Sequence, residues 1–241
     1  MKIALLGYGR MNKIVEQLLL SRGHTLAGIT DENNKEIVRD ADCYIDFSTA
    51  AVIHEYIESI AKLNIPLVIA TTGWLVDKAK FEKIILENKS RALWSGNFSL
   101  GVNIFWKSLE GMSKVFAHYP GIYDVAVHEW HHRQKADAPS GTAIQTATIL
   151  QQAIHEKKLM QTEKSDRKIK QEELHVTSTR LGNIPGTHTV LFDSEFDTIE
   201  FTHTARTREG FAIGAVMAAE KIHSLPIGLH NFYDSFDIIF K

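Results

Sequence analysis

The chain has 241 residues, which is enough for one large or two small domains with a sizeable buried core. Hydrophobic residues make up 44% of it and the formal net charge is −2, so the composition favours a globular protein and argues against nucleic-acid and membrane partners. A single cysteine excludes an internal disulfide framework. Because no apolar run has the length of a secretory signal or a membrane span, we expect a cytoplasmic protein.

The N-terminal part begins with a short apolar strand over residues 3–6, which runs into Gly7-Tyr8-Gly9-Arg10-Met11-Asn12. Apolar residues at helical spacing follow, so strand, glycine turn and helix form the first unit of a dinucleotide-binding fold. Gly7 would permit the tight turn, and Gly9 would let a pyrophosphate approach the backbone. Asn12 stands where the fingerprint has its third glycine, and a glycine turn that binds nothing is the alternative.

The next expected strand, residues 25–30, ends at Asp31, the position where an acidic side chain accepts hydrogen bonds from the adenosine ribose. Asp31 and the adjacent Glu32 would repel a 2′-phosphate, which favours NADH slightly over NADPH. Lys35 and Arg39 lie close enough in sequence to weaken that preference. A helix or turn cap is the alternative role for Asp31.

Three more expected strands, at residues 43–47, 66–70 and 91–94, alternate with helices, including one over about residues 76–87. This alternation predicts a parallel sheet, and ligands of such sheets bind at the carboxyl ends of the strands. The loops at those ends carry Gly, Ser, Thr and Asn, which suit close contact with a cofactor. Ordinary turns have the same composition.

After a helix over about residues 100–117 the pattern changes. Residues 123–127 alternate apolar and polar, and residues 174–180, 187–192 and 198–202 give three more strands, so we expect a mixed four-stranded sheet and a second domain. Another copy of the chain could cover such a sheet. The charged segment 157–173 is expected to be an exposed excursion, and residues 208–223 a final helix.

The most informative stretch runs from His128 to Ala143 and concentrates imidazoles, an arginine and a lysine just before a helix. Ser140 is a good N-cap for that helix, and the first helical amides have no internal partner. Cations, imidazoles and free N–H groups side by side predict a site for a small molecule that carries carboxylates. A basic surface loop with a capped helix is the alternative.

A zinc site on His128, His131 and His132 is disfavoured, because Arg133 and Lys135 would repel a dication, so we expect no metal. A hydrolase nucleophile at Ser140 is disfavoured as well, because the Gly-x-Ser-x-Gly elbow is missing.

The run Glu-Trp-His-His-Arg-Gln-Lys-Ala-Asp-Ala-Pro-Ser-Gly-Thr-Ala, residues 129–143, resembles the signature of bacterial 4-hydroxy-tetrahydrodipicolinate reductases. The likeness covers nearly the whole chain. Further segments that resemble the family are residues 7–12, 46–48, 70–73, 96–103, 186–188 and 203–208. Asn12, Ala70 and Thr187 depart from it, since many members have glycine at the first two positions and glutamate at the third.

The resemblance implies an α/β protein with a Rossmann-like parallel-sheet domain, residues 1–99 and 209–241, that binds the dinucleotide. A smaller α+β domain, residues 100–208, would bind the substrate and form a homotetramer through its sheet. The implied reaction belongs to diaminopimelate and lysine synthesis. Water leaves C4 of a cyclic dicarboxylate, hydride from NADH or NADPH reaches C4, and a proton reaches the resulting enamine carbon.

The resemblance also implies roles for individual residues. His131 would donate the proton, because imidazole titrates near neutrality and its acid form is available. Lys135 would stabilise developing negative charge, His132 would hold one carboxylate, and the amides of Gly141 and Thr142 would hold the other. The expected cofactor contacts are Gly7, Arg10, Met11, Asp31, Ala70, Thr71, Thr72, Gly96, Asn97, Phe98 and Ser99.

Two other functions stay open from the sequence. One is another two-domain nicotinamide oxidoreductase of amino-acid metabolism, such as an amino-acid dehydrogenase. The other is a catalytically silent dinucleotide sensor, against which the presence of His131 and Lys135 argues.

Overall fold

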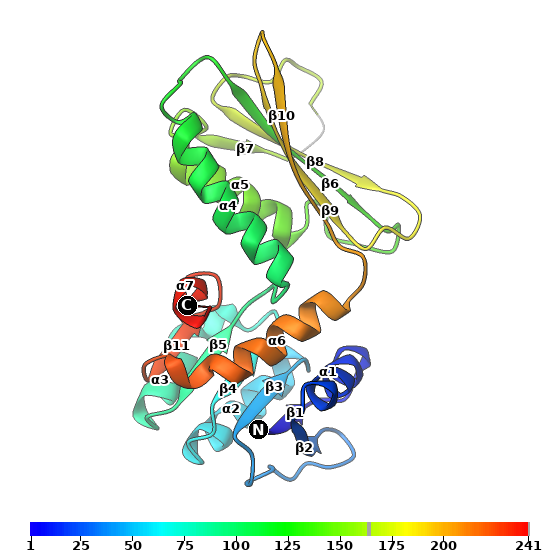
Figure 1. The fold of residues 1–241 in the computed structure, drawn as a ribbon, viewed down its shortest axis with the longest axis vertical. Helices are drawn as coiled ribbons and strands as arrows, with labels where there is room; N and C mark the ends of the chain where they lie inside the picture. The colour runs from blue at the N-terminus through cyan, green and yellow to red at the C-terminus, as the bar shows by residue number, and fades with distance from the viewer. Residues whose placement is uncertain (163–164, 241) are drawn as a thin grey trace. The chain divides into compact units, whose positions relative to one another are not determined.

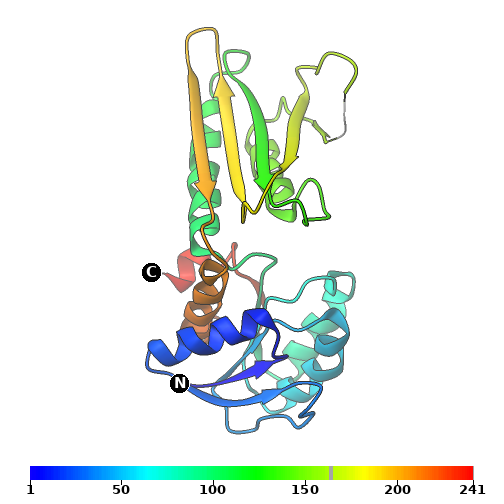
Figure 2. The same cartoon turned by 90° about the vertical axis from the view of Figure 1, so that its right-hand side faces the viewer.

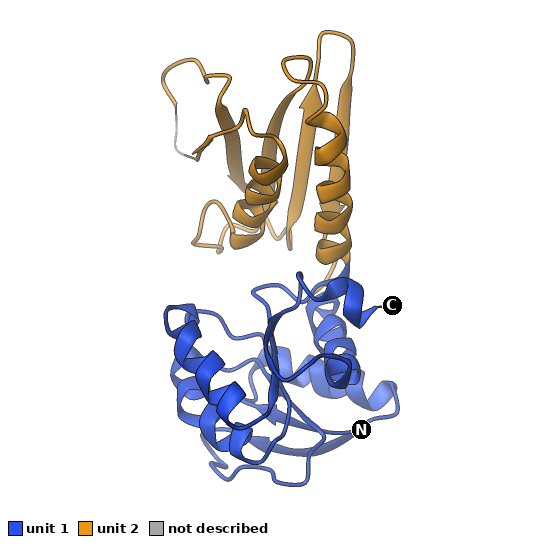
Figure 3. Cartoon of the chain, turned by 90° about the vertical axis from the view of Figure 1, so that its left-hand side faces the viewer, with its two compact units in different colours: residues 1–100, 208–241 blue, residues 101–207 orange. Residues whose placement is uncertain are grey.

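The computed structural model describes residues 1–162 and 165–240. The chain forms two compact units, Met1–Leu100 with Arg208–Lys241, and Gly101–Thr207 (Figures 1 and 3). The expected α/β class, with a parallel Rossmann-like sheet and a mixed second sheet, is confirmed. The assignment of dinucleotide binding to the first unit, and of substrate binding and assembly to the second, stays a prediction. None of the helices in the described part of the chain combines the length and apolarity needed to cross a bilayer.

Six strands, all paired in parallel, make up the sheet of the first unit, in the order β11-β5-β4-β3-β1-β2. Their bounds are Lys2–Leu6 (β1), Thr25–Thr30 (β2), Cys43–Asp46 (β3), Leu67–Ile69 (β4), Arg91–Trp94 (β5) and Gly228–Asn231 (β11). The sequence did not predict β11, because this edge strand is short and only Gly228 in it is fully buried.

Helices cover both faces of this sheet (Figure 1). They are α1 (Arg10–Ser21), α2 (Ala50–Lys62), α3 (Lys78–Glu87), α6 (Glu209–Lys221) and α7 (Phe236–Ile239), with 3-10 turns η1 (Leu75–Asp77) and η2 (Ile222–Ser224). Side chains alternate along β1, so Ile3 and Leu5 join the core made with α1 and α6, whereas Ala4 and Leu6 join the core made with α2 and α3. The parallel sheet is therefore buried on both sides, as its continuous apolar strands predicted.

The second unit contains a mixed sheet of five strands in the order β10-β9-β6-β8-β7. The strands are β6 (Asp124–His131), β7 (Leu159–Gln161), β8 (Glu173–Arg180), β9 (Thr187–Asp193) and β10 (Thr198–Thr204), and the helices are α4 (Leu100–Phe116) and α5 (Gly141–Ala153). Strand β6 is parallel to β8 and antiparallel to β9. Both helices lie on the same face of the sheet (Figures 2 and 3). Every second residue of β6 is buried, as expected for the side of the strand that the helices cover.

The expectation of four strands in this sheet is wrong by one. The additional strand, β7, lies in segment 157–173, which was expected to be exposed, and pairs with β8. Lys157 is buried. Its ammonium group donates to the carbonyls of Gln171 and Glu173 and pairs with Asp124, so the buried charge has partners. The charged composition of segment 157–173 therefore gave no indication of a strand or of a buried lysine. Residues 163 and 164 of this segment lie outside the described residues.

Candidate active site

Strand β6 carries the first residues of the signature. It was expected to span residues 123–127, but it continues to His131, so Glu129 and His131 share the buried, helix-facing side of the sheet. The register places His188 of β9 and Ser178 of β8 directly beside Glu129. Four polar side chains from three strands thus meet inside the second unit.

Glu129 is fully buried and binds several donors. Its Oε1 accepts from the Ser140 amide at 3.0 Å, the Ser178 hydroxyl at 2.8 Å and the Arg180 guanidinium at 2.9 Å, and its Oε2 accepts from the Ser140 hydroxyl. Burial alone would raise the pKa of Glu129, but the hydrogen bonds from His188, Ser140, Arg180 and Ser178 outweigh it and hold the pKa far below its usual range. Glu129 is therefore a carboxylate at neutral pH.

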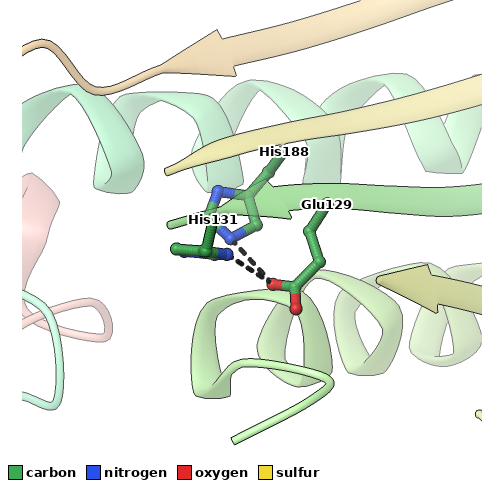
Figure 4. A group of neighbouring side chains, drawn as sticks. All are labelled: Glu129, His131 and His188. Atoms are coloured by element: carbon green, nitrogen blue, oxygen red, sulfur yellow. Dashed lines mark ion pairs between the residues drawn. The ribbon is translucent and has the colours of Figure 1, made fainter. Parts of the chain in front are cut away.

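Two imidazoles point toward the same oxygen of Glu129, Oε2 (Figure 4). Nδ1 of His131 and Nε2 of His188 are each 3.4 Å from that oxygen, and the two rings are 5.1 Å apart at 71°. Burial lowers the pKa of His131 to about 4, helped by the neighbouring His188, Lys135 and Arg180 and opposed by Glu129. This departs from the expectation of a histidine that titrates near neutrality, so protonated His131 needs further negative charge nearby.

The loop after β6 brings Lys135 into the same region. Lys135 pairs with Asp137 at 2.8 Å, and Arg180 donates to the backbone oxygens of both residues. The amide of His132 donates to the carbonyl of Ile184 at 2.8 Å. Arg180 therefore ties this loop to Glu129, and Asp137 holds the ammonium group of Lys135.

Helix α5 begins beside this loop. As predicted, Ser140 is its N-cap, and the hydroxyl accepts from the amide of Ala143 at 3.2 Å. A side chain at Gly141 would meet nothing within 4 Å, so the helix start opens onto free space. The structure therefore brings His131, Lys135 and the start of α5 together around Glu129, as a carboxylate-binding site requires.

Glu129, His131 and His188 also form the kind of group that can hold a metal ion, with ligand atoms within 4.8 Å of one another. The carboxylate already binds several donors, and the Arg180 charge lies 2.9 Å away, so these residues fit a charge network better than a dication. His128 hydrogen-bonds Thr177 on the opposite face of the sheet, so the zinc set weighed from the sequence is not assembled.

In the first unit, the expected cofactor residues lie at the carboxyl ends of the parallel strands. Gly7 has a φ of +78°, and a Cβ there would lie 2.9 Å from that of Ser48, so the turn after β1 packs closely against the loop after β3. This is where the strand order reverses, the usual place for a dinucleotide. No atom lies within 4 Å of a Cβ built on Gly9, which leaves room at the start of α1.

Asn12, at the position of the missing third glycine, has a structural role in this turn. Its buried amide donates to the carbonyls of Leu6 at 2.8 Å and Gly7 at 2.7 Å. The side chain thus fastens the glycine turn to α1. Exposed Arg10 and half-buried Met11 begin the same helix.

Asp31 caps a turn: its Oδ1 accepts from the amides of Asn33 at 2.9 Å and Asn34 at 3.0 Å. The alternative role considered for Asp31 is therefore present, and its contact with ribose stays a prediction.

The other two expected cofactor loops follow β4 and β5. In residues 70–72, the carbonyl of buried Thr71 accepts from the Trp74 indole at 2.8 Å. In residues 96–99, Oδ1 of Asn97 accepts from the amide of Ser99 at 2.9 Å, and α6 packs against the carbonyl of Phe98. Both loops lie on the edge of the sheet that carries Gly7, because β1, β3, β4 and β5 are parallel neighbours.

Sequence reasoning missed the residues that hold His131 in place. Glu129 opens the signature and His188 closes the Gly186-Thr187-His188 motif, so both carried a signal without an assigned role. For Ser178 and Arg180 the sequence predicted only that they lie on or at the end of a strand, because only the pairing of β6 with β8 brings them beside Glu129.

Comparison with known proteins identifies the family. The family profile described as dihydrodipicolinate reductase, N-terminus, matches residues 1–98, and the profile described as dihydrodipicolinate reductase, C-terminus, matches residues 101–238. The chain belongs to the dihydrodipicolinate reductase family.

Curated relatives carry the corresponding name. A 4-hydroxy-tetrahydrodipicolinate reductase of Christiangramia forsetii is 39% identical over 247 residues and covers 100% of both chains. One of Methanocaldococcus jannaschii is 38% identical over 196 residues, covering 80% of this chain and 70% of its own. The chain therefore resembles such enzymes along its whole length.

Solved structures agree on the fold. The dipicolinate-bound dihydrodipicolinate reductase from Paenisporosarcina has a TM-score of 0.77 at 20% identity and covers 97% of this chain and 98% of its own. A probable dehydrogenase from Thermotoga maritima has a TM-score of 0.59 at 11% identity and covers 99% and 93%. At these identities the likeness supports the fold alone.

Proposed function

We propose that the chain reduces 4-hydroxy-tetrahydrodipicolinate to tetrahydrodipicolinate with a nicotinamide nucleotide, as a step in diaminopimelate and lysine synthesis. The observation that carries this proposal is the meeting of His131, Lys135 and the open start of α5 around Glu129. Curated relatives named for this reaction, one of which matches the full length of the chain, support it.

The dinucleotide would bind in the first unit. The glycine turn, the start of α1 and the loops after β4 and β5 fit a pyrophosphate and its sugars, because they present backbone amides and small side chains at one edge of a parallel sheet. Asp31 and Glu32 follow β2 and would repel a 2′-phosphate, which favours NADH slightly over NADPH.

In the second unit, the substrate carboxylates would bind Lys135, His132 and the amides of Gly141 and Thr142. When bound, a nicotinamide nucleotide would supply the hydride for C4 of the dehydrated ring.

His131 then protonates the neighbouring enamine carbon. Because burial lowers the pKa of His131, the protonated form must be stabilised by the negative charge that a dicarboxylate brings. Substrate binding and proton supply are thereby coupled. Lys135 stabilises the charge that develops on the ring.

The chain would assemble as a homotetramer. The face of the second sheet opposite α4 and α5 carries half-buried Ala126, Trp130 and Leu191, and a second copy would bury it. The cytoplasmic location expected from the sequence stays a prediction.

Steady-state oxidation of NADH and NADPH by the purified protein tests the reaction. Substrate-dependent oxidation is expected, with a higher kcat/KM for NADH. An amino-acid dehydrogenase would instead reduce NAD⁺ with an amino acid, and a silent sensor would bind NADH without turnover; either result would contradict the proposal.

A further inference from the structure

We infer that Glu129 and His188 are a pair of positioning residues: Glu129 holds the Nδ1 side of His131 so that Nε2 delivers the proton, and His188 keeps Oε2 of Glu129 in place. This inference deepens the function proposed above and rests on it. It assigns a task to two buried groups that the proposed chemistry does not otherwise use.

The two oxygens of Glu129 have different surroundings. Oε1 accepts from the Ser140 amide and from the side chains of Ser178 and Arg180, and these donors come from the α5 N-cap and from β8. Oε2 faces the Ser140 hydroxyl and the two imidazoles. Oε1 thus fixes the carboxylate in the fold, and Oε2 is the atom directed at His131.

Both imidazoles retain bonding capacity. Nδ1 of His131 is buried and lies 3.4 Å from Oε2, yet makes no hydrogen bond among the described residues. Buried polar atoms rarely stay unpaired, and hydrogen bonds in active sites often shorten when substrate binds. A small rotation of His131 would complete this bond. Nε2 of His188, 3.4 Å from Oε2 and 3.2 Å from the Ser140 hydroxyl, limits how far the carboxylate can move.

The other nitrogen of His131 faces a different segment. A Cβ on Gly186 would lie 2.9 Å from Nε2, so Nε2 points toward the Gly186 turn while Nδ1 points toward Glu129. When Nδ1–H donates to the carboxylate, the mobile proton of the imidazolium is the one on Nε2. This arrangement selects one nitrogen of His131 as the donor.

The charges around His131 determine the sign of the effect. Glu129 on β6 favours the protonated ring, whereas His188 on β9, Arg180 on β8 and Lys135 in the loop after β6 oppose it. The basic limb of the pH–activity profile reports the loss of the proton from His131. Removing the Glu129 charge should therefore move this limb to lower pH.

The test is the pH dependence of kcat and KM in Glu129→Gln. We expect kcat to fall about 100-fold with KM for the substrate changed less than about threefold. The basic limb should move down by about one pH unit. Glu173→Gln is the matched control, because Glu173 is a buried carboxylate of the same sheet that pairs with Arg167; its basic limb should coincide with that of the wild type.

Two further variants test the same roles if Glu129→Gln folds poorly. Glu129→Asp, which retains the charge, should keep the wild-type basic limb although kcat falls. His188→Gln should lower kcat and leave substrate affinity intact. The inference would be overturned if Glu129→Gln kept both the kcat and the basic pH limb of the wild type. It would also be overturned if the basic limb moved as far in Glu129→Asp as in Glu129→Gln. An inactive wild type would instead refute the proposed function.

Discussion

His131 has only 6% of its surface exposed, and this burial governs its protonation. The pKa falls from 6.5 to about 4 in the folded chain. Between those values the unfolded chain binds a proton that the folded chain does not, so the contribution of His131 to stability is full above pH 6.5 and is lost as the pH falls toward 4.

Replacing His131 should reduce this loss. We expect the unfolding free energy of the wild type to drop between about pH 7.5 and about pH 5, and that of His131→Gln to drop less over the same interval. Urea unfolding at the two pH values measures the difference. His128 and His203, whose pKa values burial also lowers, leave part of the slope in both proteins. An equal drop in the variant would mean that His131 is not held neutral by the fold.

Gly186 offers a second test at the level of single residues. In Gly186→Ala the methyl group would press on Nε2 of His131, so we expect kcat to fall at least about tenfold. Gly182→Ala is the control, because Gly182 also has a positive φ but a Cβ there meets nothing within 4 Å. It should lose stability without a comparable loss of kcat, and equal kcat losses in the two variants would contradict the role given to Gly186.

The sequence singled out His131 and Lys135 through a long family signature, but it gave no role to Glu129, His188 or Arg180. These three depend on strand register, which brings β6, β8 and β9 side by side. Pairing between strands separated by about fifty residues leaves no periodic trace in the sequence. The low pKa of His131 was missed for the same reason, since burial comes from packing.

Helix α6 packs closely against residues 96–99, a loop proposed to bind the cofactor. A Cβ on Gly214 would lie 1.8 Å from the carbonyl oxygen of Phe98, so only glycine lets the helix approach this backbone.

Gly214→Ala should therefore move α6 away from residues 96–99. We expect a stability loss above about 2 kcal/mol and weaker NADH binding, measured by thermal unfolding and fluorescence titration. Gly210→Ala, in the same helix with its nearest neighbour at 3.7 Å, should be neutral or stabilising by up to about 1 kcal/mol. If Gly214→Ala kept wild-type stability and NADH affinity, residues 96–99 would be free to move, and their contact with α6 would not position the cofactor.

Periodicity predicted most elements within a few residues, because the strands of the first sheet are continuously apolar and its helices have apolar faces. The two strands it missed, β7 and β11, are short edge strands. Their residues are largely half-buried or exposed, so they lack the pattern of a core strand.

At the level of the whole molecule, the uncovered face of the second sheet is the surface proposed for assembly. Leu191 lies on it, beside Ala126 of β6 and Glu200 of β10. The sequence raised this possibility because a mixed sheet with few helices leaves one face without cover.

A charge on this face should prevent assembly. Leu191→Asp would place a second carboxylate beside Glu200, and we expect the mass measured by light scattering to drop from that of a tetramer to that of a smaller species. Val76→Asp puts the same charge on a 93% exposed residue of the first unit and should leave the mass unchanged. A wild type that is already monomeric, or a Leu191→Asp tetramer, would exclude this face as the interface.

The central claim, that a dicarboxylate is reduced at a site formed by His131 and Lys135, is tested most directly by substrate-dependent NADH oxidation in the wild type, His131→Gln and Lys135→Ala. Exposed His155→Gln serves as the control. We expect His131→Gln to lose at least about 100-fold in kcat with NADH affinity intact, Lys135→Ala to lose both kcat and substrate affinity, and His155→Gln to match the wild type. Wild-type turnover in His131→Gln and Lys135→Ala would contradict the claim.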